Sequence, residues 1–182
     1  MRLQEQYKKE VAPEMIKKFG YKNVMAVPKI EKIVVNCGFG KMVIGKSANE
    51  REKIEEYILG SLSTITAQKA VLREAKKSIA SFKLRKGLPI GAKVVLRGER
   101  MYDFLAKLIR VVFPRNRDFR GISLESVTKE GNLTFGFKEY TPFPEMKIDK
   151  GIFGLEVTVA TTAKSKEEGI ELLRLTGLPL KK

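Results

Sequence analysis

The chain has 182 residues, and its 43% hydrophobic content is enough for one domain with a real core. Lys and Arg number 36 against 21 acidic residues, and the resulting net charge of +15 points to a polyanionic partner, with nucleic acid the first candidate. With one cysteine, Cys37, which is expected to be a core thiol, and no histidine, the chain can form no internal disulfide, Cys/His metal site or Cys-His nucleophilic pair.

The first half of the chain predicts two helices around one strand. The N-terminal helix has a break or kink at Pro13 and stops at Gly20. A strand follows at about 30–37. The next helix opens with a capping box from Ser47 to Glu50 and repeats apolar residues every three or four positions, so it should pack on a sheet.

The second half continues the alternation of strands and helices. An apolar stripe from Met101 to Phe113 has the spacing of a core-facing helix, which Pro114 ends. A second capping box, Ser165 to Glu168, opens the last helix. The remaining predicted elements are a short strand near 70–73, a loop at about 75–91, and strands near 92–97, 133–139 and 155–161.

Basic residues are concentrated in one segment. Residues 69–100 carry 10 basic and 2 acidic residues, so more than half of the net charge lies in 32 positions. Glycine and proline at the end of this segment favour a long loop, and long loops are often functional. We expect a single domain over residues 1–182, with this long basic loop at about 75–91.

Alternation within the strands determines the predicted fold, because each side of a strand meets a different environment. The strands at 92–97, 133–139 and 155–161 each place apolar residues on one side and, apart from Val95, mostly polar or small residues on the other. In the first strand, Lys32 and Asn36 fall on one side. We therefore expect an α+β fold, a two-layer sandwich whose mainly antiparallel sheet has amphipathic helices on one face and a polar, partly basic open face.

One segment matches a nucleotide-binding motif. Gly40 to Ser47 fits the Walker A pattern GxxxxGK[ST] and lies between a predicted strand and a predicted helix, where a phosphate loop belongs. No later predicted strand ends in an Asp that could hold Mg²⁺, and the bulky Met42, Val43 and Ile44 suit a packed turn better than a loop around phosphate. A P-loop nucleotide-binding protein is therefore an alternative, while Ser47 is expected to act as a helix cap.

A pair of aromatic residues suggests a second RNA-binding mode. Phe135 and Phe137 flank Gly136 as in the base-stacking motif of an RNA-recognition sheet. Exposing both rings would also expose Leu133 and would bury Lys138, which is costly for an unpaired lysine. Both phenylalanines are therefore expected in the core.

Five segments together resemble one family of ribosomal proteins, and the match covers nearly the whole chain in order. The chain resembles the bacterial or organellar form of the family of large ribosomal subunit protein five. The segments are 21–36 (YKNVMAVPKIEKIVVN), 75–85 (AKKSIASFKLR), 98–102 (GERMY), 114–121 (PRNRDFRG) and 172–179 (LLRLTGLP).

This resemblance implies a structural constituent of the large ribosomal subunit that helps anchor 5S ribosomal RNA in the central protuberance. The implied partners are 5S rRNA, the 23S-type large-subunit rRNA, transfer RNA in the peptidyl site, small-subunit ribosomal protein thirteen and neighbouring large-subunit proteins. It implies no enzyme activity, cofactor or metal. Because the chain has no secretory apolar region at its start and no apolar run of membrane-spanning length, we expect a cytoplasmic protein in the ribosome, with no membrane partner. A non-ribosomal basic RNA-binding regulator is the other alternative.

By position, the resemblance assigns residues to two RNA contacts. Lys and Arg neutralise phosphates, whereas Asn, Gln, Ser and backbone amides can meet sugar hydroxyls and base edges. The 5S rRNA surface comprises Lys29, Lys32, Asn36, Gly38, Gln68, Lys69, Lys93, Arg97 and Arg100. The transfer-RNA-contacting loop comprises Lys76, Lys77, Ser78, Phe82, Lys83 and Arg85. Residues 114–120 and 140–150 are candidates for protein contact.

Overall fold

The computed structural model describes residues 2–117, 119–146 and 151–181 and has an α+β fold with one five-stranded sheet. The strand order is β2-β3-β1-β5-β4, and neighbouring strands run antiparallel. The predicted fold class is thus confirmed. The strands are β1 (Ile30–Gly38), β2 (Val71–Glu74), β3 (Pro89–Leu96), β4 (Leu133–Phe137) and β5 (Leu155–Thr161).

The chain forms two compact units. Unit 1 comprises Met1–Val34, Leu96–Phe135 and Val157–Lys182, and unit 2 comprises Val35–Val95 and Gly136–Glu156. The expectation of one domain over residues 1–182 stays a prediction.

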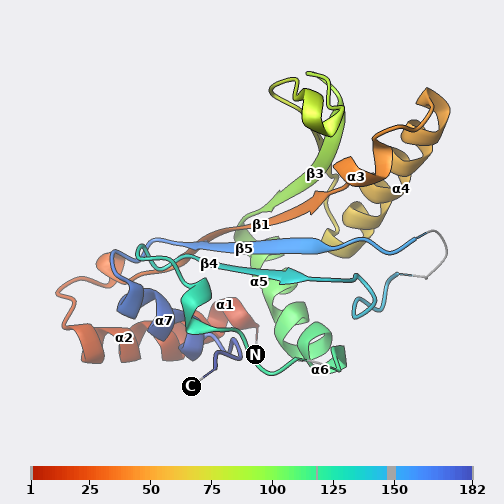
Figure 1. Cartoon of the computed structure of the whole chain (residues 1–182). Helices are drawn as coiled ribbons and strands as arrows, with labels where there is room; N and C mark the ends of the chain where they lie inside the picture. Colours follow the sequence, from red (N-terminus) through yellow and green to blue (C-terminus); the bar gives the residue numbers. More distant parts are fainter. Residues whose placement is uncertain (1, 118, 147–150, 182) are drawn as a thin grey trace. The chain divides into compact units, whose positions relative to one another are not determined.

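Helices of unit 1 lie on one side of β5 (Figure 1). Their buried side chains include Met15, Leu105 and Leu172, all fully buried, so they form the core of this unit. The helices are α1 (Leu3–Gln6), α2 (Ala12–Phe19), α5 (Gly98–Lys107), α6 (Phe113–Arg115) and α7 (Lys166–Leu175), with short 3₁₀ turns at Val24–Ala26 and Leu124–Ser126.

Two prolines lie inside helices, and a π-helical turn precedes each. The turn Tyr7–Val11 leads to Pro13, and the turn Leu108–Val112 leads to Pro114. Proline lacks an amide donor and its ring crowds the carbonyl four residues earlier, and the wider π turn relieves that crowding. The predicted irregularity at Pro13 is therefore a π turn, and the helix predicted to end at Pro114 continues by one residue. Gly20 ends α2 in the left-handed region, with φ 70°, as predicted.

Unit 2 is built around α4 (Ala48–Thr66), which buries Ile58, Leu62 and Ile65. The helix begins at the predicted capping box: the Glu50 carboxylate accepts hydrogen bonds from the Ser47 amide at 3.0 Å and the Ser47 hydroxyl at 2.9 Å. A short helix, α3 (Gly40–Val43), precedes it.

The predicted basic loop is an extension of the β2–β3 hairpin, with a 3₁₀ turn (Ala80–Phe82) at its tip (Figure 1). Strand β3 begins at Pro89 and not at Ala92, so the loop is shorter than predicted. Backbone hydrogen bonds continue the pairing beyond the strands, from Ala75 N to Leu88 O at 2.9 Å and from Ile79 N to Leu84 O at 2.9 Å. The segment 75–88 is therefore a hydrogen-bonded extension of the hairpin, called the finger below.

Alternation of burial confirms the predicted faces of β3 and β5, whose inward residues are buried and whose intervening residues are not. In β1 the same pattern runs from Lys32 to Gly38, and it includes Cys37, which is buried; this burial raises the pKa of the thiol to about 12. In β4, Phe137 is buried as predicted, but Phe135 is only half-buried. Its ring packs 5.4 Å from that of Phe113, so it belongs to a cluster within the protein.

Candidate nucleic-acid interface

Asn36 and Lys93 are half-buried in unit 2, on the side of β1 and β3 opposite the buried Cys37 and Ala92, which is the open face of this unit. Antiparallel pairing places Val71 beside Lys93 and Arg73 beside Gly91, so the exposed Val71 and Arg73 share this face. The result is a surface with cations and an amide, which suits phosphates and base edges.

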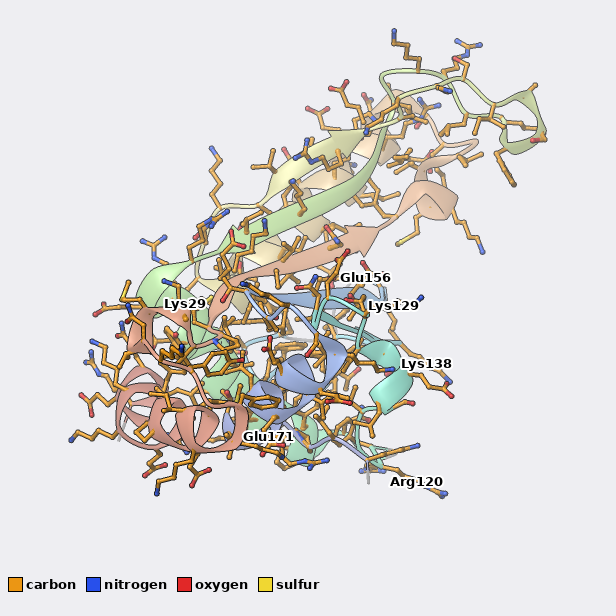
Figure 2. The ribbon with its side chains drawn as sticks, turned by 90° about the vertical axis from the view of Figure 1, so that its left-hand side faces the viewer. Lys29, Arg120, Lys129, Lys138, Glu156 and Glu171 are labelled. Carbon is orange, nitrogen blue, oxygen red and sulfur yellow. The ribbon has the colours of Figure 1, made fainter. Side chains whose placement is uncertain are left out.

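Asn36 has a neighbour that the sequence did not predict. Its side-chain amide nitrogen donates to Glu156 Oε1 at 3.3 Å across two strands that are 120 positions apart in the chain. Glu156 is exposed on β5, where Figure 2 labels it. A carboxylate on a basic face can accept hydrogen bonds from base amino groups, which phosphate-binding cations cannot do.

Three further residues assigned to 5S rRNA lie in unit 2, in different settings. Gly38 is exposed, and a Cβ added there would meet no atom within 4 Å, so the fold itself would admit a side chain. Gln68 uses its amide nitrogen to donate to Val95 O at 2.8 Å, which ties the turn after α4 to β3. Lys69 is exposed in that turn, directly after Gln68. The turn begins at Ala67, whose backbone is left-handed with φ 52°.

In unit 1, Lys29 is held by its backbone. Its amide donates to Thr162 Oγ1 at 3.0 Å and its carbonyl accepts from the Thr162 amide at 2.9 Å, so the start of β1 is fixed to the end of β5. The Lys29 side chain remains exposed, at the surface of the unit in Figure 2. A cation on a fixed backbone can set register on an RNA backbone.

Lys32 and Arg97 share one carboxylate, that of Glu31. Lys32 Nζ lies 3.8 Å and Arg97 Nη1 lies 3.2 Å from Glu31 Oε1. All three side chains are at least one-third exposed, so the pairs are screened by water and individually weak. Glu31 orients both cations and also offsets part of their charge. Arg100 is exposed in the first turn of α5.

An exposed apolar pair precedes Lys29 in unit 1, and sequence reasoning missed it. Val24 is 65% and Met25 is 83% exposed, in a 3₁₀ turn capped by the Asn23 side chain, which accepts from the Met25 amide at 2.9 Å. Because two neighbouring apolar residues in so short a turn have no periodicity, the sequence carries no sign of their exposure.

The finger presents cations along its whole length. The residues assigned to transfer-RNA contact are all exposed, and Phe82 at the tip is 65% exposed. Lys83 has a left-handed backbone, with φ 50°, and its amide donates to Ala80 O at 3.0 Å. Ser78 Oγ accepts from the Lys86 amide at 2.9 Å, so Ser78 also stabilises the finger.

The Walker-like segment is a packed turn and not a phosphate loop. Lys46 Nζ lies 3.7 Å from Glu50 Oε1, and Val43 is fully buried. A phosphate loop needs free backbone amides that converge on the ligand. Here three amides donate to the chain's own carbonyl oxygens, namely Met42 to Phe39, Ile44 to Gly40 and Lys46 to Val43. The P-loop alternative therefore has no support in the geometry, and Ser47 has the predicted capping role.

The two segments considered for protein contact differ in exposure. In the first, Arg115, Arg117 and Arg120 are exposed, and Figure 2 labels Arg120. In the second, Tyr140 and Phe143 are fully buried and cannot touch a partner. Positions 118 and 147–150 lie outside the described residues.

Metal-binding clusters and membrane-spanning helices are both absent from the described part of the chain. Over residues 2–117, 119–146 and 151–181, no three His, Cys, Asp or Glu side chains are grouped so that they could hold a metal ion. None of the helices described is both long and apolar enough to cross a membrane.

Comparison with known proteins gives one consistent result. Two family models match, "Ribosomal protein L5" over residues 23–85 and the model of the C-terminus of the same ribosomal family over residues 89–180. Large ribosomal subunit protein uL5 of Dictyoglomus turgidum is 54% identical over 182 residues, which cover 99% of this chain and 98% of that protein. The uL5 protein of Halothermothrix orenii is 49% identical, over 97% of this chain and 97% of that protein. The uL5 protein of Thermoanaerobacter sp. is 50% identical, over 100% of this chain and 99% of that protein.

Proposed function

The chain belongs to the ribosomal protein L5 family, that of large ribosomal subunit protein uL5, and from this premise we propose that it binds 5S rRNA and helps anchor it in the central protuberance. It is a structural protein of the large ribosomal subunit and not an enzyme. The observation that carries the proposal is that each unit has an open, partly basic strand face, which suits the shape-based and phosphate-based recognition of folded RNA.

Each unit contributes its own part of the proposed 5S rRNA surface. In unit 1 the cations Lys29, Lys32, Arg97 and Arg100 would neutralise phosphates. In unit 2 the proposed contacts are Asn36, Gly38, Gln68, Lys69 and Lys93. The exposed Gly38 supports this reading, because a glycine that the fold does not need permits close approach of a partner.

We also propose that the finger contacts transfer RNA in the peptidyl site through Lys76, Lys77, Ser78, Phe82, Lys83 and Arg85. Its exposure and its density of cations support a contact with a nucleic-acid backbone. The exposed arginines between residues 114 and 120 are candidates for contact with small-subunit protein thirteen or neighbouring large-subunit proteins.

The experiment that tests the main proposal measures binding of the full chain to 5S rRNA, transfer RNA and an unrelated hairpin at physiological salt. We expect 5S rRNA to bind most tightly. Equal affinity for all three RNAs would instead indicate a general basic RNA-binding regulator. Asn36→Ala serves as a specific probe: removing a neutral donor and acceptor should weaken 5S rRNA binding with almost no change in its salt dependence.

A further inference from the structure

Glu156 places a carboxylate on the open face of unit 2, among the residues proposed to bind 5S rRNA. The Asn36 amide nitrogen donates to its Oε1 at 3.3 Å, and no cation among the described residues pairs with it. A negative charge on this face repels phosphates and so lowers the affinity for every RNA alike. The groups of an RNA that offset this repulsion are hydrogen-bond donors, which the bases and the ribose hydroxyls carry and the phosphates lack.

One flank of Glu156 is free of side chains. Thr134 on β4 and Thr158 on β5 lie opposite each other, with their hydroxyl oxygens 3.1 Å apart. Two residues further along these antiparallel strands, Gly136 therefore lies opposite Glu156. Gly136 is exposed, and a Cβ added there would meet only Leu155 O, at 3.8 Å. A planar group can thus approach the carboxylate over Gly136 without meeting a β4 side chain.

The other flank of Glu156 carries Asn36 and then Lys93. The Phe39 amide donates to Ile90 O at 2.9 Å, and the same antiparallel register, carried three residues along β1 and β3, places Lys93 opposite Asn36. Figure 1 shows β1 between β3 and β5. Strands lie about 4.8 Å apart, so the backbones at Lys93 and Glu156 are separated by roughly 10 Å. This is the reach of one nucleotide from its phosphate to the outer edge of its base.

The acceptors in this row favour one base. Because a carboxylate only accepts, its partner atom on Asn36 is the amide nitrogen, and the Asn36 carbonyl oxygen is left as a further acceptor. The carboxylate has lone pairs for about four hydrogen bonds, and the contact with Asn36 uses one of them. Two acceptor oxygens side by side match two adjacent N–H donors. Among the standard bases, only guanine has such a pair on its Watson–Crick edge, namely N1–H and the N2 amino group, and an unpaired base offers that edge to a protein.

We propose that Glu156 recognises the Watson–Crick edge of an unpaired guanine of 5S rRNA, with Asn36 beside it and Lys93 on the adjoining phosphate. The inference rests on the proposed function, since it takes 5S rRNA as the partner of this face, and it adds a residue that selects sequence. Cations on this face supply affinity for any RNA, whereas the carboxylate favours one base. Glu156 thus weakens binding to other RNAs and increases the preference for the correct one.

The first test compares the affinity of the full chain for 5S rRNA with its affinity for an unrelated hairpin at physiological salt. Glu156→Gln should lower the preference for 5S rRNA roughly 5- to 150-fold, which is the discrimination supplied by one bidentate contact with a base. The matched control is Glu52→Gln, which makes the same charge change at an exposed position of α4 in the same unit and should leave the preference unchanged. Because Glu156 is exposed, Glu156→Gln should unfold at the temperature of the wild type.

The second test identifies the base. Kethoxal adds to N1 and the N2 amino group of a guanine whose Watson–Crick edge is free. One guanine that reacts in free 5S rRNA should therefore be protected in the wild-type complex and remain reactive in the Glu156→Gln complex. Inosine at that position lacks the amino group, so it should weaken binding of the wild type and change binding of Glu156→Gln much less. Equal losses for both proteins would show that Glu156 only orients Asn36, and would overturn the inference.

The two proposals fail in different ways. If the wild type does not prefer 5S rRNA to the hairpin, the proposed function fails. If it does, and Glu156→Gln keeps the full preference or no guanine of 5S rRNA is protected by the wild type, the guanine inference alone is overturned.

Discussion

Replacing Lys32 with alanine removes one cation from the open face of unit 1 and leaves the buried side of β1 intact. Removal of one phosphate-neutralising cation lowers the slope of log K against log salt by about 0.9 for a duplex and about 0.7 for a single strand. At about 0.15 M salt this corresponds to a reduction of 5S rRNA affinity of roughly four- to sixfold.

The neighbouring Glu31 modifies this expectation. Its carboxylate lies within 3.8 Å of Lys32 Nζ and 3.2 Å of Arg97 Nη1. Exposed ion pairs are worth about 0–1 kcal/mol, so Glu31→Gln should raise affinity by up to about fivefold by releasing both cations toward phosphate. The opposite effects of adjacent substitutions on the same strand distinguish a direct RNA contact from a change in folding.

The assay is 5S rRNA binding at several salt concentrations, with thermal melts of each variant. Lys17→Ala is the matched control, because Lys17 is exposed on α2, on the helix-covered side of unit 1, and its removal changes the net charge equally. An equal drop in slope for Lys32→Ala and Lys17→Ala would refute the reasoning, since it would show that net charge alone governs binding.

Four further sets of substitutions test the core, the helix cap, its titration and the finger. Ile33→Ala, at a fully buried position of β1, should lower the free energy of unfolding by about 2 to 5 kcal/mol and affect RNA binding only through folding; an unchanged melt would mean that the strand faces are misassigned. Ser47→Ala should lower the free energy of unfolding by about 1 kcal/mol, because it removes the helix cap. Lys46→Ala should leave 5S rRNA binding nearly unchanged. Saturable ATP binding by the wild type would contradict the assignment of this segment as a packed turn. Hydrogen bonds from the Ser47 amide and hydroxyl, with the charge of Lys46, lower the pKa of the Glu50 carboxyl. The contribution of this carboxylate to stability is therefore present above its unfolded pKa of about 4.3 and is lost as the pH falls through the lowered folded value. Melting temperatures measured between about pH 5 and pH 3 should depend less on pH for Glu50→Gln than for the wild type. The finger cations to be neutralised together are Lys76, Lys77, Lys83 and Arg85. Their loss should weaken contact with transfer RNA on the assembled ribosome and leave binding to isolated 5S rRNA unchanged. Loss of the 5S rRNA complex would contradict the assignment of the finger to transfer RNA alone.

The sequence by itself determined the features that depend on neighbours along the chain. The capping box at Ser47, the helix stop at Gly20 and the alternation from Leu155 to Thr161 are all local, because helix ends and strand faces repeat over two to four residues. The concentration of charge in residues 69–100 was also visible, as was the family resemblance. These were sufficient for the fold class and for the family.

Tertiary structure alone decided which distant residues meet. The pairing of Asn36 with Glu156 and of Arg97 with Glu31 depends on strand register, which brings together residues 120 and 66 positions apart. Phe135 is half-buried because its place is set by the ring of Phe113 and not by alternation. A groove of about 530 Å³ lined by Phe82 and Met42 exists because the finger and α3 lie beside each other, and no local pattern in either segment encodes that proximity. Local rules thus specified the elements, whereas non-local packing specified the surfaces that a partner would meet.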